Sequence, residues 1–93
     1  MKLVWSPKFT RAARKLARRK PELLDQLDSA LHRLETDPHH PALRTHKLSG
    51  EFEGCQACSA GYDFRIVFEL VRPRPSMEME IHLLNVGTHD EVY

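Results

Sequence analysis

The hydrophobic period of the chain changes once, near residue 41, and this change most constrains the fold. Before it, apolar residues recur at helical spacing over residues 9–17 and again over residues 24–34. Ser6-Pro7 and Lys20-Pro21 place a proline where a first helical turn accepts it, and Asp37-Pro38 ends the second helix. Two helices joined so closely are predicted to form an antiparallel hairpin.

After this point apolar and polar residues alternate, as they do in half-buried strands. The clearest strand is predicted over residues 62–70, with Tyr62 and Phe64 among its apolar positions and Asp63 and Arg65 on the other side. Shorter strands are expected over residues 3–5, 43–48, 55–60 and 77–86. The order predicts an α+β fold, in which an N-terminal strand and a helix hairpin pack on a mostly antiparallel sheet of about four to five strands.

The C-terminal stretch is predicted to be ordered. Thr88 and Glu91 stand at the spacing of a capping box, which favours a short helical turn. On such a turn His89 and Tyr93 are four residues apart and share one face. The sequence therefore holds an imidazole and a phenol together at its end.

Length and hydropathy indicate one domain over residues 1–93 and a cytoplasmic protein. No apolar run approaches the roughly 20 residues that span a membrane. The N-terminus lacks the basic and then apolar pattern of a signal peptide. In the cytoplasm Cys55 and Cys58 are expected to stay reduced.

The net charge of +1 conceals a strong asymmetry. Residues 1–20 carry eight basic side chains and no acidic one, whereas the rest of the chain carries six basic and thirteen acidic ones. A basic N-terminal helix suggests a surface for phosphates or for an acidic partner. An ordinary solvated helix face is the alternative.

Most of the histidines, and both cysteines, are interpreted as structural. His32, His39, His40 and His82 lack neighbours at ligand spacing and are expected to be polar surface groups. The Cys55-x-x-Cys58 pair lacks a second pair of ligands, and residues three apart on a strand point to opposite faces. We predict two buried or half-buried thiols and no metal site.

Five residues remain that suit one reaction: His46, Asp63, Arg65, His89 and Tyr93. They come from separate segments that the strand order brings to one sheet face. Imidazoles act as acid or base near neutral pH, an arginine matches phosphate oxygens, and a tyrosine stacks on a base or donates a proton. These groups suit cleavage of RNA through its own 2′-hydroxyl without a metal. The alternative is an Asp–Arg pair beside unrelated imidazoles.

Three local signatures extend this interpretation: HKLSG at 46–50, DFRIVF at 63–68 and VGTH at 86–89. Together with the order of elements they resemble the RelE/ParE superfamily of bacterial type II toxins, most closely its YafQ-like branch of ribosome-dependent mRNA endonucleases. The resemblance implies a toxin that cuts mRNA in the ribosomal A site and is silenced by a cognate antitoxin. By position it makes His89 and His46 the active-site histidines, Asp63 the acidic residue, Arg65 the phosphate ligand and Tyr93 the terminal aromatic residue.

The resemblance also has departures and alternatives. Ser59 stands where YafQ-like members carry another histidine, and only Lys47 represents the lysine cluster of RelE-type toxins. A ParE-like inhibitor of DNA gyrase, or a catalytically weak member that mainly binds its antitoxin, are the alternative functions. No cofactor is implied. The residues predicted to bind RNA or the ribosome are Lys8, Arg11, Arg14, Lys15, Arg18, Arg19 and Lys47.

Overall fold

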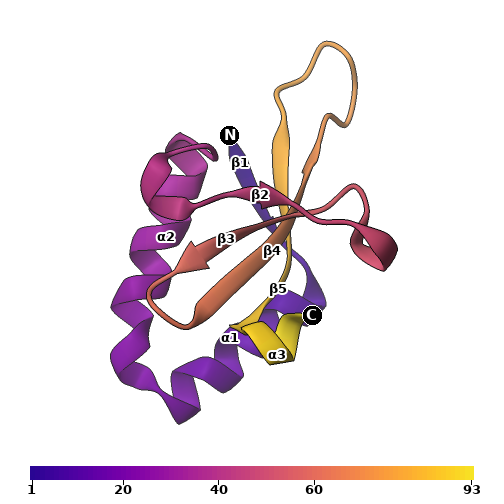
Figure 1. The fold of residues 1–93 in the computed structure, drawn as a ribbon. Coiled ribbons are helices and arrows are strands. Elements are labelled where there is room, and N and C mark those ends of the chain that lie inside the picture. The colour runs from indigo at the N-terminus through magenta and orange to yellow at the C-terminus, as the bar shows by residue number, and fades with distance from the viewer.

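The computed structural model describes residues 1–93 and has the α+β architecture that the sequence predicts. Two helices lie against one face of a five-stranded sheet, and a short third helix ends the chain (Figure 1). Three short 3-10 turns, η1 (Pro21–Leu23), η2 (Pro41–Leu43) and η3 (Gly50–Phe52), join the elements. The elements in order are β1 (Lys2–Trp5), α1 (Pro7–Arg19), α2 (Leu24–Thr36), β2 (His46–Lys47), β3 (Gln56–Ala60), β4 (Phe64–Val71), β5 (Glu80–Thr88) and α3 (His89–Val92).

The sheet has the strand order β1-β5-β4-β3-β2 and is antiparallel except at β1. β1 runs parallel to β5, although the two helices and three other strands separate these strands along the chain. This pairing ends where Trp5 meets Leu83. The last part of β5 therefore has β4 on one side and no strand on the other.

Local signals explain where the helices begin. The Ser6 hydroxyl accepts a hydrogen bond from the Phe9 amide at 3.0 Å, so Ser6 caps α1 as its sequence predicts. Pro21 begins η1 instead of the second helix, and α2 begins only at Leu24. In Figure 1 the two helices form a V, with α1 beside β5 and α2 rising beside β3.

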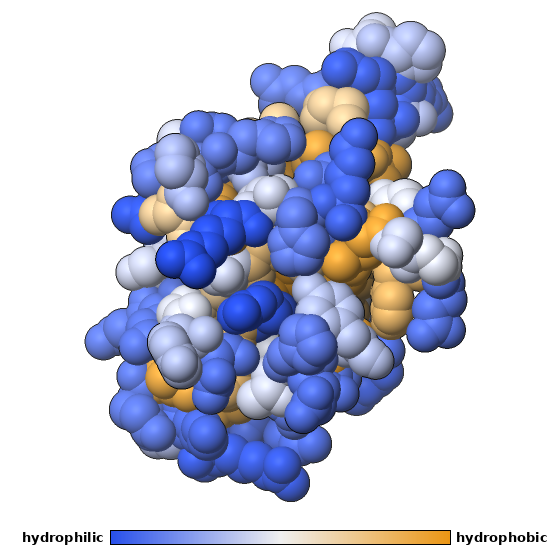
Figure 2. All heavy atoms as spheres, viewed as in Figure 1, coloured by the Kyte–Doolittle hydropathy of each residue, from blue (hydrophilic) through white to orange (hydrophobic).

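One hydrophobic core fills the space between the helices and the sheet. Phe9 and Leu34 from the helices pack with Phe68, Ile81 and Leu83 from the strands, and all five are fully buried. Hydrophilic side chains cover most of the face seen in Figure 2, and apolar atoms appear only in the gaps between them. No helix is long and apolar enough to cross a membrane.

Three strand predictions were wrong at their ends. β4 begins at Phe64, because residues 61–63 form a turn, and Tyr62 is 92% exposed instead of pointing into the core. The strand expected over 43–48 shrinks to His46–Lys47, since η2 ends at Arg44, whose φ of 52° lies in the left-handed region. The last strand begins at Glu80, not at residue 77, and continues to Thr88.

The predicted capping box forms at α3. The Glu91 amide donates to the Thr88 hydroxyl at 3.3 Å, and the Thr88 amide donates to the Glu91 carboxylate at 2.9 Å. Val92 is buried, and a Cβ atom on Gly87 would lie 3.4 Å from it. Gly87 pairs with Arg65, on the sheet face opposite the core. The turn of α3 therefore packs on the face that the two long helices leave open.

Candidate functional site

The aromatic and basic groups beside α3 form the first candidate site, here named the tail site: Phe52, Arg65, His89 and Tyr93. The His89 and Tyr93 rings lie 4.7 Å apart in an edge-to-face arrangement, so the predicted shared face exists. Tyr93 also meets Phe52 of η3 edge to face, with 6.2 Å between ring centroids. The Tyr93 amide donates to the His89 carbonyl at 3.2 Å. Two aromatic contacts and a backbone hydrogen bond therefore hold the last residue in place.

Arg65 supplies positive charge to the tail site. Its Nη1 donates to the Phe64 carbonyl at 3.0 Å and to the Tyr62 carbonyl at 3.4 Å, which fixes the guanidinium beside the start of β4. Burial raises the pKa of the Tyr93 phenol, and the Arg65 charge partly offsets this rise. Because the raised pKa starts from an already basic value, Tyr93 carries its proton at neutral pH and is able to donate a hydrogen bond.

His46 and Asp63 make no hydrogen bond, ion pair or ring contact with the other predicted site residues. His46 pairs with Ala57, and Ala57 pairs with Val67, so register places the imidazole on the same sheet face as Arg65 but two strands away. Its Nδ1 lies 3.2 Å from the Arg44 carbonyl, a contact that favours a proton on Nδ1. Asp63 lies in the exposed turn before β4 and makes no ion pair.

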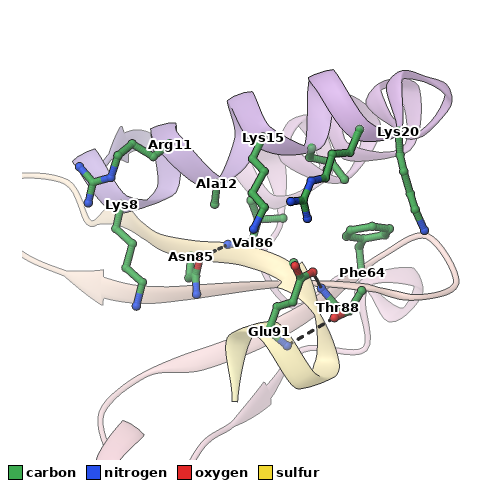
Figure 3. A pocket seen from close by; sticks show the side chains of 13 residues that line it. Lys8, Arg11, Ala12, Lys15, Lys20, Phe64, Asn85, Val86, Thr88 and Glu91 are labelled. Atoms are coloured by element: carbon green, nitrogen blue, oxygen red, sulfur yellow. Dashed lines mark hydrogen bonds between the residues drawn. The ribbon is translucent and has the colours of Figure 1, made fainter.

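A groove between α1 and the end of β5 forms a second candidate site. It has a volume of about 600 Å³ and a partly apolar floor that includes Leu16, Phe64 and Val86. Side chains from α1 and from Lys20, the residue that follows this helix, line it (Figure 3). Its basic residues are Lys8, Arg11, Lys15, Arg19 and Lys20.

The predicted basic residues therefore divide between surfaces. Those of the groove recur every three or four residues along one side of α1. Arg14 instead lines a separate depression between α1 and α2, and Arg18 lines neither. Lys47 is exposed on the edge strand β2. Lys20, which the sequence prediction left out, lies with its ammonium 6.0 Å from the centre of the Phe64 ring.

Glu91 connects the groove to the tail site, because it lines the groove and caps α3. It is the one acidic residue among those that line the groove. The hydrogen bond from the Thr88 amide is the main reason that the pKa of its carboxyl is lowered, and the charges of Lys15 and Arg19 lower it further. In Figure 3 its carboxylate lies below Lys15, beside Thr88.

Besides Lys20, two residues of these sites were missed by sequence reasoning. Phe52 follows the HKLSG stretch, and nothing in the sequence distinguishes it from any other aromatic residue of a loop. Asn85 is the second, because its role depends on a strand edge that only the sheet topology reveals.

The residues interpreted as structural lie outside both sites. Cys58 is buried, which raises the pKa of its thiol to about 12, whereas Cys55 is half-buried. His82 contacts Glu80 at 2.9 Å, and the exposed His32 bonds within α2. No group of three or more His, Cys, Asp or Glu side chains is arranged to hold a metal ion.

Comparisons with solved structures show the same fold in bacterial toxins. YafQ from E. coli aligns with a TM-score of 0.78 and 15% identity, over 99% of this chain and 97% of that one. The E. coli DinJ–YafQ complex gives 0.72 and 18%, over 99% and 97%. A metal-bound toxin from Helicobacter pylori gives 0.78 and 21%, over 100% and 99%.

The sequence comparison is more specific than these structural ones. No curated protein matches the chain. However, residues 1–93, the whole chain, match the family described as bacterial toxin of type II toxin-antitoxin system, YafQ. By this match and its fold, the chain belongs to the YafQ family of toxins of bacterial type II toxin–antitoxin systems.

Proposed function

We propose that the chain is an endoribonuclease that cuts mRNA on the ribosome, without a metal ion or cofactor, and that it is inhibited by a cognate antitoxin in the cytoplasm. The observation that carries the proposal is the tail site, where an exposed imidazole lies against a protonated phenol near a guanidinium. The family of the chain supports the toxin role, and the DinJ–YafQ complex is an example of a family member bound to another protein.

In the proposed reaction the 2′-hydroxyl of the RNA attacks the adjacent phosphorus, and the bond to the 5′-oxygen of the next nucleotide breaks. A base takes the proton from the 2′-hydroxyl, and an acid gives one to the departing oxygen. We assign one of these roles to His89. Arg65 stabilises the charge that develops on the phosphate oxygens, and Tyr93 stacks on a base or donates a hydrogen bond.

The partner of His89 in acid–base transfer is His46, with Asp63 as a further group. Neither is hydrogen-bonded to His89 in the free chain, and His46 lies two strands away from Arg65, so the substrate has to span the sheet face between β2 and α3. The basic side of α1 and Lys47 on β2 then face ribosomal RNA, whose dense phosphates attract clustered lysine and arginine.

The test adds purified protein to ribosomes that carry a defined mRNA and maps the new 5′ ends. His89→Ala should abolish cutting without unfolding the chain, because the His89 side chain is 71% exposed. His32→Ala is the matched control, since His32 is equally exposed, at 73%, on a distant helix. Protein dialysed against a chelator before it is added should keep its activity.

Two outcomes contradict this proposal. If His89→Ala cuts mRNA as fast as the unmodified chain, the tail site is not the active site. If the protein stops growth but leaves mRNA intact in the presence of ribosomes, the ParE-like action on DNA gyrase becomes the better reading of this fold.

A further inference from the structure

The free edge of β5 has two backbone donors without a strand partner. Pairing with β1 ends at Leu83, and the amides of Val86 and Thr88 lie beyond that point. Two residues apart on a strand, they point in the same direction. The Val86 amide donates to the side-chain oxygen of Asn85 at 2.9 Å, and the Thr88 amide donates to Glu91 at 2.9 Å (Figure 3). Side-chain oxygens of the same segment thus take the place of the backbone acceptors that a neighbouring strand would supply.

The space beside this edge has the charge and shape of a peptide groove. Lys8 and Lys15 extend from α1 toward β5 (Figure 3). Arg11 and Arg19 line the same groove, and Glu91 is the only acidic residue among its lining. The floor is partly apolar and includes Val86 of the free edge. An extended segment that lies here meets backbone donors on one side and cations on the other.

We propose that the groove between α1 and the free edge of β5 binds an extended acidic peptide segment as an added strand. This mode of binding takes its affinity from main-chain hydrogen bonds and its specificity from alternate side chains. Under the proposed function the segment belongs to the antitoxin, and only this identification rests on that function. RNA fits the cations equally well but not the edge, because Phe64 is buried and offers no exposed ring for a base.

Binding at this edge has a consequence for the tail site. An added strand must displace the Asn85 amide and the Glu91 carboxylate from the two backbone donors. Without its carboxylate contact, the capping box of α3 is broken, and α3 carries His89 and positions Tyr93. The absence of a side chain at Gly87 leaves room for Glu91 in the capping box, since a Cβ atom on residue 87 would lie 3.0 Å from the Glu91 Cβ.

The experiment measures binding of a fluorescent octapeptide of alternating glutamate and valine to the full chain by anisotropy. A matched octapeptide, N-methylated at every residue after the first, keeps the charge but cannot lie as an added strand, because methyl groups on both of its edges clash with β5 and keep the peptide carbonyls away from the Val86 and Thr88 amides. Because the methylated peptide cannot accept the two strand hydrogen bonds, it should bind about tenfold more weakly. NMR should show slower amide exchange at Val86 and Thr88 only with the unmethylated peptide.

Variants separate the edge from general electrostatic attraction. Lys15→Glu should weaken peptide binding, whereas Arg14→Glu, the same charge change on the other side of α1, should not. Glu91→Ala should tighten binding, because it removes the group that competes for the Thr88 amide. If Glu91 only stabilised the groove, Glu91→Ala would instead weaken peptide binding.

Equal binding of the two peptides would overturn the proposal, and so would protection of Val86 and Thr88 by a short oligouridylate but not by the peptide. The measurement uses neither ribosomes nor cleavage. Failure of the nuclease proposal would therefore appear in the mRNA assay alone, and failure of strand addition in the peptide assay alone.

Discussion

The most direct perturbation of the tail is Thr88→Val, which removes one half of the capping box and keeps the shape of the side chain. The lost contact is the hydrogen bond from the Glu91 amide to the Thr88 hydroxyl, at 3.3 Å. Removal of an N-cap side chain costs about 1 kcal/mol. An energy of that size changes an equilibrium about fivefold.

This cost should fall on the docking of α3 and not on the whole fold. The helix has four residues and places only Val92 in a buried position, whereas the main core lies on the other sheet face. Opening of the turn therefore leaves the packing of Phe68 and Ile81 intact. Local openings of this kind have free energies that are smaller than the free energy of global unfolding.

Amide hydrogen exchange followed by NMR measures the effect. In Thr88→Val the Tyr93 amide, which donates to the His89 carbonyl, should exchange about fivefold faster, and amides of β4 should keep their rates. Thr10→Val is the control, because it removes a threonine hydroxyl that donates to the carbonyl of Ser6, the N-cap of α1, at 3.0 Å. Unchanged exchange at Tyr93, or equal acceleration of every amide, would refute the view that the capping box holds the tail separately.

Two further predictions concern ionisable groups. The pKa of Glu91 is lowered in the folded chain, so the stability that its cap contributes is present above the usual glutamate range and is lost as the pH falls through the lowered pKa. Hydrogen exchange of the α3 amides should therefore accelerate over that pH interval. In Glu91→Gln this acceleration should be absent. Burial raises the pKa of Cys58 to about 12, so a thiol reagent at pH 8 should modify Cys55 first and reach Cys58 only after denaturation; rapid reaction of both thiols in the folded chain would contradict this.

Sequence patterns predicted the elements whose signals are local. Ser6 caps α1, and Thr88 and Glu91 form the capping box, because each signal depends on residues within one turn. The strand ends were less predictable, since alternation continues into turns. Tyr62 fits the pattern of β4, yet Gly61, with a φ of 82°, bends the chain just before it.

The candidate sites were predictable only in part, because local sequence patterns do not show which elements pack together. Helical spacing brings His89 and Tyr93 together, and this contact was predicted. Helical spacing also places Lys15 and Arg14 on different sides of α1, but only the packing of α1 on β5 decides which side borders a groove. The contact of Phe52 with Tyr93 depends on η3, which no periodicity reveals.

The two sites meet in one residue, and this has a thermodynamic consequence. Glu91 faces the basic groove, whereas His89 and Tyr93 lie on the other side of the same helical turn. A strand that enters the groove has to break the cap, which reduces its affinity by the free energy of that cap, about 1 kcal/mol. Coupling between two sites is reciprocal, so the same strand loosens the tail site by the same factor. A substrate that fixes His89 and Tyr93 should therefore weaken binding in the groove about fivefold.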